Sequence, residues 1–379
     1  MAKLLMISGD RALAGGKRGA FYNTLEEFHR YWERIDVLVP RVANPEVKPQ
    51  GYFGNVFIHT SSWPLWLQPW WIYKKGQALF KEHKFDLITV HEYPPFYNGL
   101  GARWLWNKIK VPYVLELMHI PGYPRSGSAK EWFYKRLTRW LIKWDANRAK
   151  AIRVINKKET PDFLVNSGIA RERLIYIPAF YIDLDIFRPL AEEKKYDLIF
   201  VGRLARNKGI RLLLEAVKLS IFNYQFPIKC LIVGDGPLKE SIKMEIGKCP
   251  PAGEAGKLEK FITLHGWAKD SGEIARLINQ AKLLIMPSYN EGGPRVVLEA
   301  MACGVPVLAT PVGIVPDVIT PETGAIINWQ AESIVREATK LLNDPVRYQA
   351  CSAGGLGLVK QFERISAIRN YAEKLKGLI

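Results

Sequence analysis

The chain has 379 residues, carries a formal net charge of +17 at pH 7, and is 48% hydrophobic and 24% charged. This length is more than one hydrophobic core ordinarily fills and favours two domains of similar size, while the composition excludes a disordered chain. No apolar run approaches the ~18 residues that span a bilayer.

The opening segment MAKLLMISGD is too short for a signal peptide and is typical of a first strand. The four cysteines form no C-x-x-C pair and have no metal-ligand spacing with the six histidines, which predicts reduced thiols in a cytosolic protein. Ten of the twelve tryptophans lie in the first half, together with most of the excess positive charge. This favours either a solvated basic surface over a Trp-rich core or a surface that meets an anionic partner.

Short β-rich apolar runs alternate with helical patterns along the whole chain, which is typical of parallel α/β sheets. The predicted strands of the first half are 4–8, 35–39, 55–60, 87–91, 113–118, 152–155 and 174–177. Those of the second half are 198–201, 230–233, 262–264, 283–286, 307–309 and 325–327, and helices are predicted at 212–220, 238–247, 273–280 and 296–303. The polar stretch 187–197 is the predicted linker, which gives an N-terminal domain at 1–190 and a C-terminal domain at 191–358.

The first strand of the second half runs into IFVGRLARNKGI, which places Arg203 and Lys208 on a turn that leads into a helix. Two cations at this spacing predict a diphosphate clamp, with Arg203 binding through its planar fork and Lys208 acting as a point charge. Two surface cations on a loop would be the better interpretation if this turn stood alone. However, a Gly-Asp-Gly-Pro run that begins at Gly234 follows the next strand of the same sheet.

The segment NEGGPRVVLEAMACGVPVLAT holds two glutamates eight positions apart around a Gly-Gly-Pro turn. Pro294 is predicted to begin a helix that carries Glu299, while Glu291 stays on the preceding loop. Gly292 and Gly293 would let a ligand approach the backbone closely, and the helix N-terminus would favour an anion. Together these signals predict a nucleoside diphosphate that carries a group rich in hydroxyls.

These motifs resemble the retaining glycosyltransferases of family 4, a group 1 family with the GT-B fold, in which two Rossmann-like domains with parallel sheets face each other across a cleft. The resemblance covers nearly the whole chain and is strongest in the second half, at Glu-x7-Glu and the following AMACGVPVLAT. It implies that Arg203 and Lys208 bind the donor diphosphate. It also implies that Glu291 lies against the transferred sugar and that Glu299 binds the ribose hydroxyls. Many members have an aliphatic residue where this chain has Arg295, so donor contacts are expected from the neighbouring glycines.

The first half supplies further matches to the family. Gly15 and Gly16 follow the first strand and resemble the glycine loop that faces the donor phosphates. The surrounding GDRALAGGKRGA is not a P-loop, since Arg18 stands where Ser or Thr would follow the lysine. His119 ends a strand and resembles the family's cleft histidine near the reacting sugar, with a structural histidine as the alternative. His91 ends the preceding strand and is a second candidate.

The resemblance implies metal-independent transfer of a hexose from a UDP- or GDP-sugar to a hydroxyl of a glycan or lipid-linked acceptor, with retention at the anomeric carbon and no cofactor. Asp183 and Asp185 have the Asp-x-Asp spacing of metal-binding transferases, but here a structural turn is expected. The alternatives are a non-hydrolysing sugar-nucleotide epimerase, a phosphorylase and a basic nucleic-acid-binding module. Nucleic acid is disfavoured because carboxylates at the most ordered turn would repel a phosphate chain.

Two further expectations concern surfaces of the first domain. Residues 359–379 have one apolar face at helical spacing, and the relatives imply that this helix packs back on the first domain. The stretches SSWPLWLQPWWIYKKG and KEWFYKRLTRWLIKWDANRAK combine tryptophans with cations, which predicts peripheral docking on an anionic membrane face. The alternative is that the apolar stripe of the second stretch, which includes Phe133, Trp140 and Trp144, faces its own core.

Overall fold

The computed structural model describes residues 1–43, 45, 51–222, 226–247 and 258–379, so Cys249 falls outside the described residues. Packing divides the chain into two compact units. Unit 1 consists of Met1–Ile120, Phe133–Ala179 and Ile365–Ile379, and unit 2 consists of Pro121–Trp132 and Phe180–Arg364. The chain therefore passes into unit 2 at Phe180, ahead of the expected boundary at residue 190, and a short segment of its first half also belongs to unit 2.

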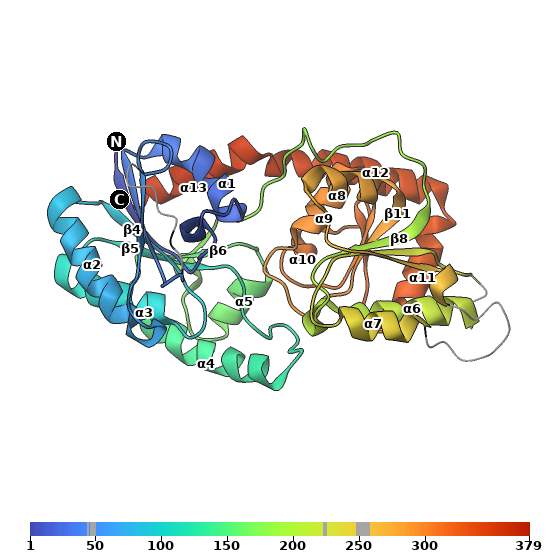
Figure 1. Cartoon of the computed structure of the whole chain (residues 1–379), viewed down its shortest axis with the longest axis horizontal. Helices are drawn as coiled ribbons and strands as arrows, with labels where there is room; N and C mark the ends of the chain where they lie inside the picture. Colours follow the sequence, from blue (N-terminus) through green and yellow to red (C-terminus); the bar gives the residue numbers. More distant parts are fainter. Residues whose placement is uncertain (44, 46–50, 223–225, 248–257) are drawn as a thin grey trace. The chain divides into compact units, whose positions relative to one another are not determined.

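Unit 1 is built on one seven-stranded parallel sheet with the order β3-β2-β1-β4-β5-β6-β7 (Figure 1). Its strands are β1 (Lys3–Ile7), β2 (Arg34–Val39), β3 (Val56–Thr60), β4 (Leu87–His91), β5 (Tyr113–Leu117), β6 (Ala151–Val154) and β7 (Leu174–Tyr176). The helices that contribute to it are α1 (Ala20–Phe28), α2 (Gln68–His83), α3 (Tyr97–Ile109), α4 (Ala129–Ala146), α5 (Glu159–Val165) and α13 (Arg364–Lys376), with short 3-10 turns η1 (Leu13–Gly15), η2 (His29–Tyr31), η3 (Leu65–Leu67) and η4 (Arg171–Arg173). The central strands are buried along nearly their whole length, as expected for parallel strands covered on both faces.

Unit 2 is built on a six-stranded parallel sheet with the order β10-β9-β8-β11-β12-β13 (Figure 1). Its strands are β8 (Tyr196–Val201), β9 (Cys230–Val233), β10 (Ile262–His265), β11 (Ala281–Met286), β12 (Val307–Ala309) and β13 (Gly324–Ile326). Its helices are α6 (Ile210–Phe222), α7 (Lys239–Gly247), α8 (Ser271–Asn279), α9 (Arg295–Ala302), α10 (Val315–Val318), α11 (Ala331–Leu342) and α12 (Pro345–Val359), with 3-10 turns η5 (Arg206–Lys208), η7 (Leu258–Lys260) and η8 (Lys360–Phe362). The strand order reverses between β8 and β11, and open α/β sheets bind ligands at such a switch point.

The predicted fold class is confirmed, since both halves form parallel sheets and every predicted strand is present within two residues of its predicted ends. The local sequence explains several helix starts. α8 begins after Asp270, whose Oδ1 accepts the Glu273 N–H at 2.8 Å, and α12 begins after Asp344, whose Oδ1 accepts the Arg347 N–H at 2.9 Å. An aspartate at this position satisfies an amide that the helix itself leaves unpaired.

A cluster of polar and charged side chains lies in unit 1, and the sheet register brings three of them together. His91 on β4, Glu116 on β5 and Arg153 on β6 are register partners on neighbouring strands. Arg153 Nη1 lies 2.7 Å from Glu116 Oε1, His91 Nε2 lies 2.8 Å from Glu116 Oε2, and Tyr371 of α13 donates to Glu116 Oε1 at 2.6 Å. Burial by itself raises the pKa of the Glu116 carboxyl, but the charges of Arg153 and His91 outweigh it and hold the pKa at about 2.

We expect this cluster to make the protein acid-sensitive. The folded-state pKa of Glu116 lies below its ordinary value of 4.5, so its contribution to stability is fully present above that value and is lost as the pH falls toward 2. Glu116→Gln should remove that part of the pH dependence and should lower stability at neutral pH, because Arg153 stays buried without an anion. Urea unfolding at several pH values measures both effects, with the exposed Glu172→Gln as the control. Parallel acid losses in the wild type and Glu116→Gln would contradict this assignment.

Candidate functional site

The turn between β8 and α6 carries the predicted cations. Arg203 is exposed just past the end of β8, and Lys208 ends the short η5 turn. Gly209 follows with φ 66°, and a Cβ at this position would lie 1.9 Å from the carbonyl oxygen of Pro287. Only glycine combines that left-handed backbone with so close an approach. The turn therefore lies in close contact with the segment that follows β11. β11 is the neighbour of β8 in the sheet.

Lys208 and Glu291 meet at this junction, although the sequence assigned them to different parts of a ligand. Lys208 Nζ forms an ion pair with Glu291 Oε1, and Ser288 Oγ donates to the same oxygen at 2.8 Å. The Glu291 side chain is 12% exposed and that of Lys208 is 27% exposed, so both still reach the surface. The arrangement provides an ammonium, a carboxylate and a hydroxyl side by side at the switch point of the sheet.

The Glu-x7-Glu element differs in one detail from its prediction. Pro294 does not begin the helix; it is the N-cap, with ψ 99°, and α9 begins at Arg295. The physical reason is that Pro294 keeps the extended ψ that the residue ahead of a helix adopts. Glu299 lies in the second turn of α9, where burial raises the pKa of its carboxyl and the Arg295 guanidinium opposes that rise.

The glycines of this element lie in crowded surroundings. A Cβ on Gly293 would lie 1.4 Å from Cε1 of Phe180. A Cβ on Gly313 would lie 2.4 Å from the carbonyl oxygen of Gly292. Arg295 donates to the carbonyl oxygen of Tyr181 at 3.3 Å, with its guanidinium 5.1 Å from the Tyr181 ring centre. The Arg295 side chain is thus engaged within unit 2, which leaves the backbone of the glycines as the available contact.

The Gly-Asp-Gly-Pro run directly follows β9 and lies at the same edge of the sheet, where the parallel strands end. Gly234 has φ 144°, and a Cβ there would lie 1.9 Å from the carbonyl oxygen of Gly202 at the end of β8. Its N–H donates to the carbonyl oxygens of His265, the last residue of β10, and of Gly266, which follows it. Asp235 is occupied by its own loop, since it binds the Gly236 N–H and forms an ion pair with Lys239 at 2.7 Å. Gly234 therefore brings three strand ends close together.

The residues predicted in the first half lie in unit 1. Gly15 ends η1 and Gly16 follows it with φ 71°, and a side chain at Gly15 would meet nothing within 4 Å. His119 is exposed two residues after β5. His91 is held on both ring nitrogens, by Glu116 and by Ser8 Oγ at 3.2 Å from its Nδ1, which is a structural role.

The Asp-x-Asp pair forms a turn. Asp183 Oδ1 accepts the N–H groups of Asp185 and Ile186 at 3.1 and 3.4 Å. Within the described residues, no group of three or more His, Cys, Asp or Glu side chains is arranged to hold a metal ion.

Sequence reasoning missed a strap that crosses the Glu291 loop, formed by Pro121–Trp132. Asn290 is buried, and its Nδ2 donates to the Arg125 carbonyl oxygen at 3.1 Å and to Glu131 Oε2 at 3.0 Å. The Arg125 guanidinium lies 5.4 Å from the ring centre of Tyr289 and 5.5 Å from that of Trp329. The sequence does show Asn290 beside Glu291, but no local pattern pairs it with residues about 160 positions earlier.

Comparison with known protein families gives two matches that together span most of the chain. The family described as glycosyl transferases group 1 matches residues 182–355, and a glycosyl transferase 4-like domain matches residues 24–179.

Individual relatives are similar at moderate identity. An uncharacterized glycosyltransferase of Methanocaldococcus jannaschii is 29% identical over 245 residues, which are 64% of this chain and 60% of that protein. The sulfoquinovosyl transferase of Arabidopsis thaliana is 25% identical over 347 residues, which are 86% of this chain and 64% of that protein. An Escherichia coli galactosyltransferase, named for UDP-Gal and α-D-GlcNAc-diphosphoundecaprenol, is 25% identical over 61% of this chain and 59% of that protein. The matched region thus spans less than two thirds of the length of each of these relatives.

Solved structures share the fold over the whole chain. A sucrose-phosphate synthase from Thermosynechococcus elongatus superposes with a TM-score of 0.78 at 19% identity, covering 100% of this chain and 99% of that one. An Anabaena protein in complex with UDP superposes with a TM-score of 0.74 at 18% identity, covering 100% of both chains.

Proposed function

The chain belongs to the group 1 glycosyl transferases with the GT-B fold, and from this membership we propose that it transfers a sugar from a nucleoside-diphosphate sugar to an acceptor hydroxyl, with retention at the anomeric carbon. The observation that carries the proposal is the meeting of Lys208, Glu291 and Ser288 at the switch point of the unit 2 sheet, with Arg203 on the same turn as Lys208 and Glu299 on α9. A cation pair meets a diphosphate there, and carboxylates accept hydrogen bonds from sugar hydroxyls.

A uridine nucleotide is the donor that we propose to test first, because a protein of the same fold binds UDP and another structure of it contains UDP-glucose. In the proposed reaction the bond between the anomeric carbon and the diphosphate oxygen breaks, and negative charge grows on the leaving UDP. Arg203 and Lys208 stabilise that charge where it develops. Glu291 orients the transferred sugar, Glu299 holds the ribose, and Gly292 and Gly293 offer backbone contacts.

The ion pair between Lys208 and Glu291 prepares the site for such a ligand. Without a donor, the charges of Lys208 and Glu291 compensate each other, and both side chains reach the surface. When a diphosphate binds, the Lys208 ammonium gains a second anionic partner while it still contacts Glu291. Glu291 is then held in place by Lys208 and Ser288, which fixes the carboxylate against the sugar. His119, Gly15 and Gly16 lie in unit 1 and are candidates for further donor contacts from the family resemblance alone.

A panel of UDP- and GDP-sugars, incubated with and without a lipid-linked acceptor, tests the function. Release of free nucleoside diphosphate together with a glycosylated acceptor supports transfer. A change of sugar configuration without a second substrate would indicate an epimerase, and a sugar phosphate formed from inorganic phosphate would indicate a phosphorylase. Binding to nucleic acid without any of these reactions would overturn the proposal.

We expect transfer to survive treatment with EDTA, because fixed protein cations meet the diphosphate charge. Asp183, the residue with metal-site spacing, is already bound to backbone amides. Measuring the rate with EDTA and then with added Mg²⁺ or Mn²⁺ tests this. An absolute need for a divalent cation would contradict the proposed charge balance and would return Asp183 and Asp185 to consideration as ligands.

We further propose that unit 1 docks on an anionic membrane surface to reach a lipid-linked acceptor. α4 buries Thr138, Ile142, Asp145 and Ala146, whereas Phe133, Trp140 and Trp144 of the predicted apolar stripe are exposed. Leu137 and Leu141 of the same stripe are half-buried, so the aromatic part of the stripe faces outward while its leucines partly contact the protein. An apolar arc on the outside of a basic helix suits the interface of a bilayer.

Residues of α3 contact both Trp-rich stretches, and we call the tryptophans concerned the aromatic face. It comprises Trp66, Trp70, Trp104, Trp140 and Trp144. α3 connects its two sides, since Trp104 meets Trp70 of α2 at 6.0 Å between ring centres and the Arg103 guanidinium lies 3.6 Å from the ring centre of Trp144 on α4. Trp66 and Trp140 are 67% and 70% exposed. Trp71 belongs to the first Trp-rich stretch, which was predicted to dock on a membrane, but its side chain is buried.

An apolar cavity of about 110 Å³ adjoins the aromatic face between α3 and α4. Its lining includes Phe96, Leu100, Leu141 and Trp144. No helix among the described residues is long and apolar enough to cross a membrane. The acceptor named for the Escherichia coli relative is lipid-linked, which agrees with a surface-bound enzyme.

Flotation with liposomes of graded anionic lipid content tests docking. The double substitution Arg136→Glu/Lys143→Glu should weaken binding more than tenfold, since each cation near an anionic leaflet contributes about 1 kcal/mol. Trp140→Ser should weaken it at low and high salt alike. Trp267→Ser, a comparably exposed tryptophan of unit 2, is the matched control. Absence of binding to the most anionic vesicles at low salt would rule docking out, and a soluble acceptor would then be the better proposal.

A further inference from the structure

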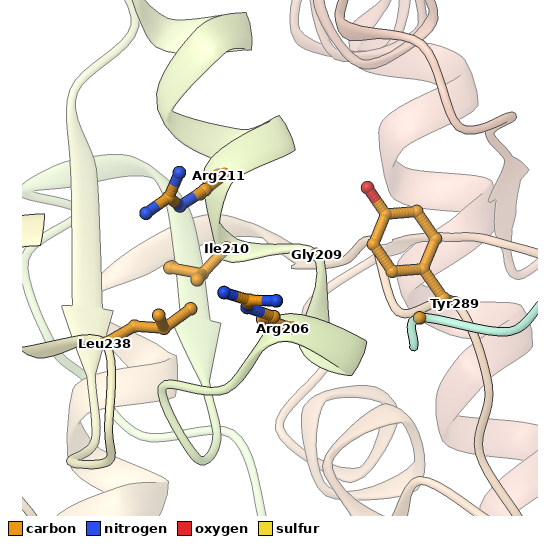
Figure 2. Close-up of a pocket in the computed structure, with 7 residues that line it drawn as sticks. Arg206, Gly209, Ile210, Arg211, Leu238 and Tyr289 are labelled. Atoms are coloured by element: carbon orange, nitrogen blue, oxygen red, sulfur yellow. The ribbon is translucent and has the colours of Figure 1, made fainter. Parts of the chain in front are cut away.

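A second cavity lies in unit 2, on the same turn as Lys208 but apart from Glu291. It has a volume of about 220 Å³, and its lining includes Gly127, Arg206, Ile210, Arg211, Leu238 and Tyr289. Figure 2 shows the Arg206 side chain between Leu238 on one side and the Tyr289 ring on the other. Neither Lys208 nor Glu291 lines it.

The turn divides its cations between two places. Lys208 points to Glu291, whereas Arg206 two residues before it and Arg211 three residues after it line the cavity. Gly209 lies between Lys208 and Arg211, with a left-handed backbone that approaches Pro287 closely. The proposed donor diphosphate already has Arg203 and Lys208 as its two cations. The donor diphosphate therefore does not need Arg206 or Arg211 as a cation.

The positive charge of the cavity has no acidic partner among the residues that the structure describes. In the described part of the chain, no carboxylate lies within ion-pair distance of Arg206 or Arg211. Arg211 Nη2 is oriented by a hydrogen bond to Ser241 Oγ at 3.2 Å. The acid closest along the strap, Glu131, is already occupied by the Gly127 N–H at 2.7 Å and by Asn290. A guanidinium group that lines a cavity without a counter-ion attracts an anionic ligand.

We propose that this cavity binds a phosphoryl group other than the donor diphosphate. Two guanidinium groups suit a phosphate because their planar forks donate paired hydrogen bonds. Tyr289 adds a hydroxyl and an aromatic face, and its ring is itself braced by Arg125 of the strap. The volume exceeds that of a ~150 Å³ cavity that takes up benzene, so there is room for part of an attached ring.

If the proposed function holds, the phosphoryl group belongs to the acceptor, because Tyr289 lies two residues from Glu291 and Arg206 two residues from Lys208. A phosphorylated sugar and free inorganic phosphate share the recognised chemistry. The binding site itself rests only on the geometry of unit 2 and does not depend on the transfer reaction.

Isothermal titration of the full-length protein, saturated with UDP, tests the site with inorganic phosphate, glucose 6-phosphate and glucose as probes. We expect both phosphorylated probes to bind and glucose not to bind. Arg206→Gln and Arg211→Gln should each weaken that binding about tenfold or more, as loss of a charged hydrogen bond does. UDP affinity should change less than about twofold. Arg336→Gln, on the exposed side of α11, is the matched control, and Lys208→Ala should lower UDP affinity while leaving phosphate binding intact.

The titration distinguishes a phosphorylated sugar from free phosphate as the source of the phosphoryl group. Tighter binding of glucose 6-phosphate than of phosphate would identify a phosphorylated sugar as the source, and equal binding would identify free phosphate. Displacement of phosphate by UDP, or unchanged binding in both arginine variants, would overturn the proposal. If neither UDP nor GDP binds to the wild type, the proposed function fails, and the phosphate titration of the unliganded protein still decides whether the cavity is a site.

Discussion

Replacing Lys208 or Arg203 with alanine is expected to slow sugar transfer by about 10²-fold or more. Both side chains belong to the turn after β8, and each is proposed to donate a charged hydrogen bond to the diphosphate as its bond to the sugar breaks. The charge on the leaving group is largest in the transition state, so kcat should fall together with the affinity for UDP. Steady-state kinetics over a range of donor concentrations, with UDP binding measured separately, resolves the two effects.

The two substitutions differ in one useful respect. Lys208→Ala also removes the ion-pair partner of Glu291, whereas Arg203→Ala leaves that pair intact. Lys208→Ala should therefore have the larger effect on kcat. Lys218→Ala is a suitable control, because Lys218 lies on α6 and pairs with Glu245 at 2.8 Å on the surface. Full activity in either cation variant would remove the diphosphate clamp from the mechanism.

The two carboxylates of the Glu-x7-Glu element should separate in their kinetics. Glu291→Ala is expected to lower kcat, because placement of the transferred sugar matters most in the transition state. Glu299→Ala should mainly raise the donor KM, because contacts to the ribose persist in the ground state and the transition state alike. Donor kinetics at saturating acceptor measure both parameters.

Isosteric variants refine this comparison. Glu291→Gln retains the shape of the side chain but weakens its contact with Lys208, and it should resemble Glu291→Ala in kcat. Glu299→Gln can still accept one hydrogen bond, so its donor KM should lie between those of the wild type and Glu299→Ala. If Glu299 substitutions lower kcat while Glu291 substitutions raise only KM, the two roles are reversed.

Much of the fold could be predicted because the strands are short apolar runs with clear ends. β4, β9 and β12 were predicted to the residue, since flanking Gly, Pro or polar residues end each run. Pro294 shows the limit of this reasoning, because proline is favoured at the first helical position, while its fixed φ is also compatible with the N-cap that it occupies here. Sequence alone gave no means of choosing between them.

The site was predictable in part. Arg203, Lys208, Glu291 and Glu299 lie on recognisable motifs, and their roles remain predictions. The ion pair between Lys208 and Glu291 was not foreseen, because it depends on β8 and β11 being neighbours in the sheet while two strands and their helices separate them in sequence.

The orientation of α4 also could not be read from its sequence. Its side chains offer two arcs with apolar character, one with Phe133 and Trp140 and another with Ile142 and Ala146. Periodicity identifies an arc but does not say which one meets the sheet. Burial of the smaller arc follows from tertiary packing, which also accommodates Asp145, a carboxyl whose pKa is raised to about 6 by burial.

The assignment of Ile365–Ile379 to unit 1 has a consequence for how the chain folds as a ribosome makes it. Domains generally fold in the order of their synthesis, N-terminal first. Here Tyr371, which donates to buried Glu116, emerges among the last residues of the sequence. Until then the cluster of Glu116, Arg153 and His91 in the first sheet lacks the Tyr371 hydroxyl, although unit 2 has been synthesised in full. A released chain that is truncated after Arg364 should therefore have a protease-resistant second unit, while its first unit is still open to cleavage.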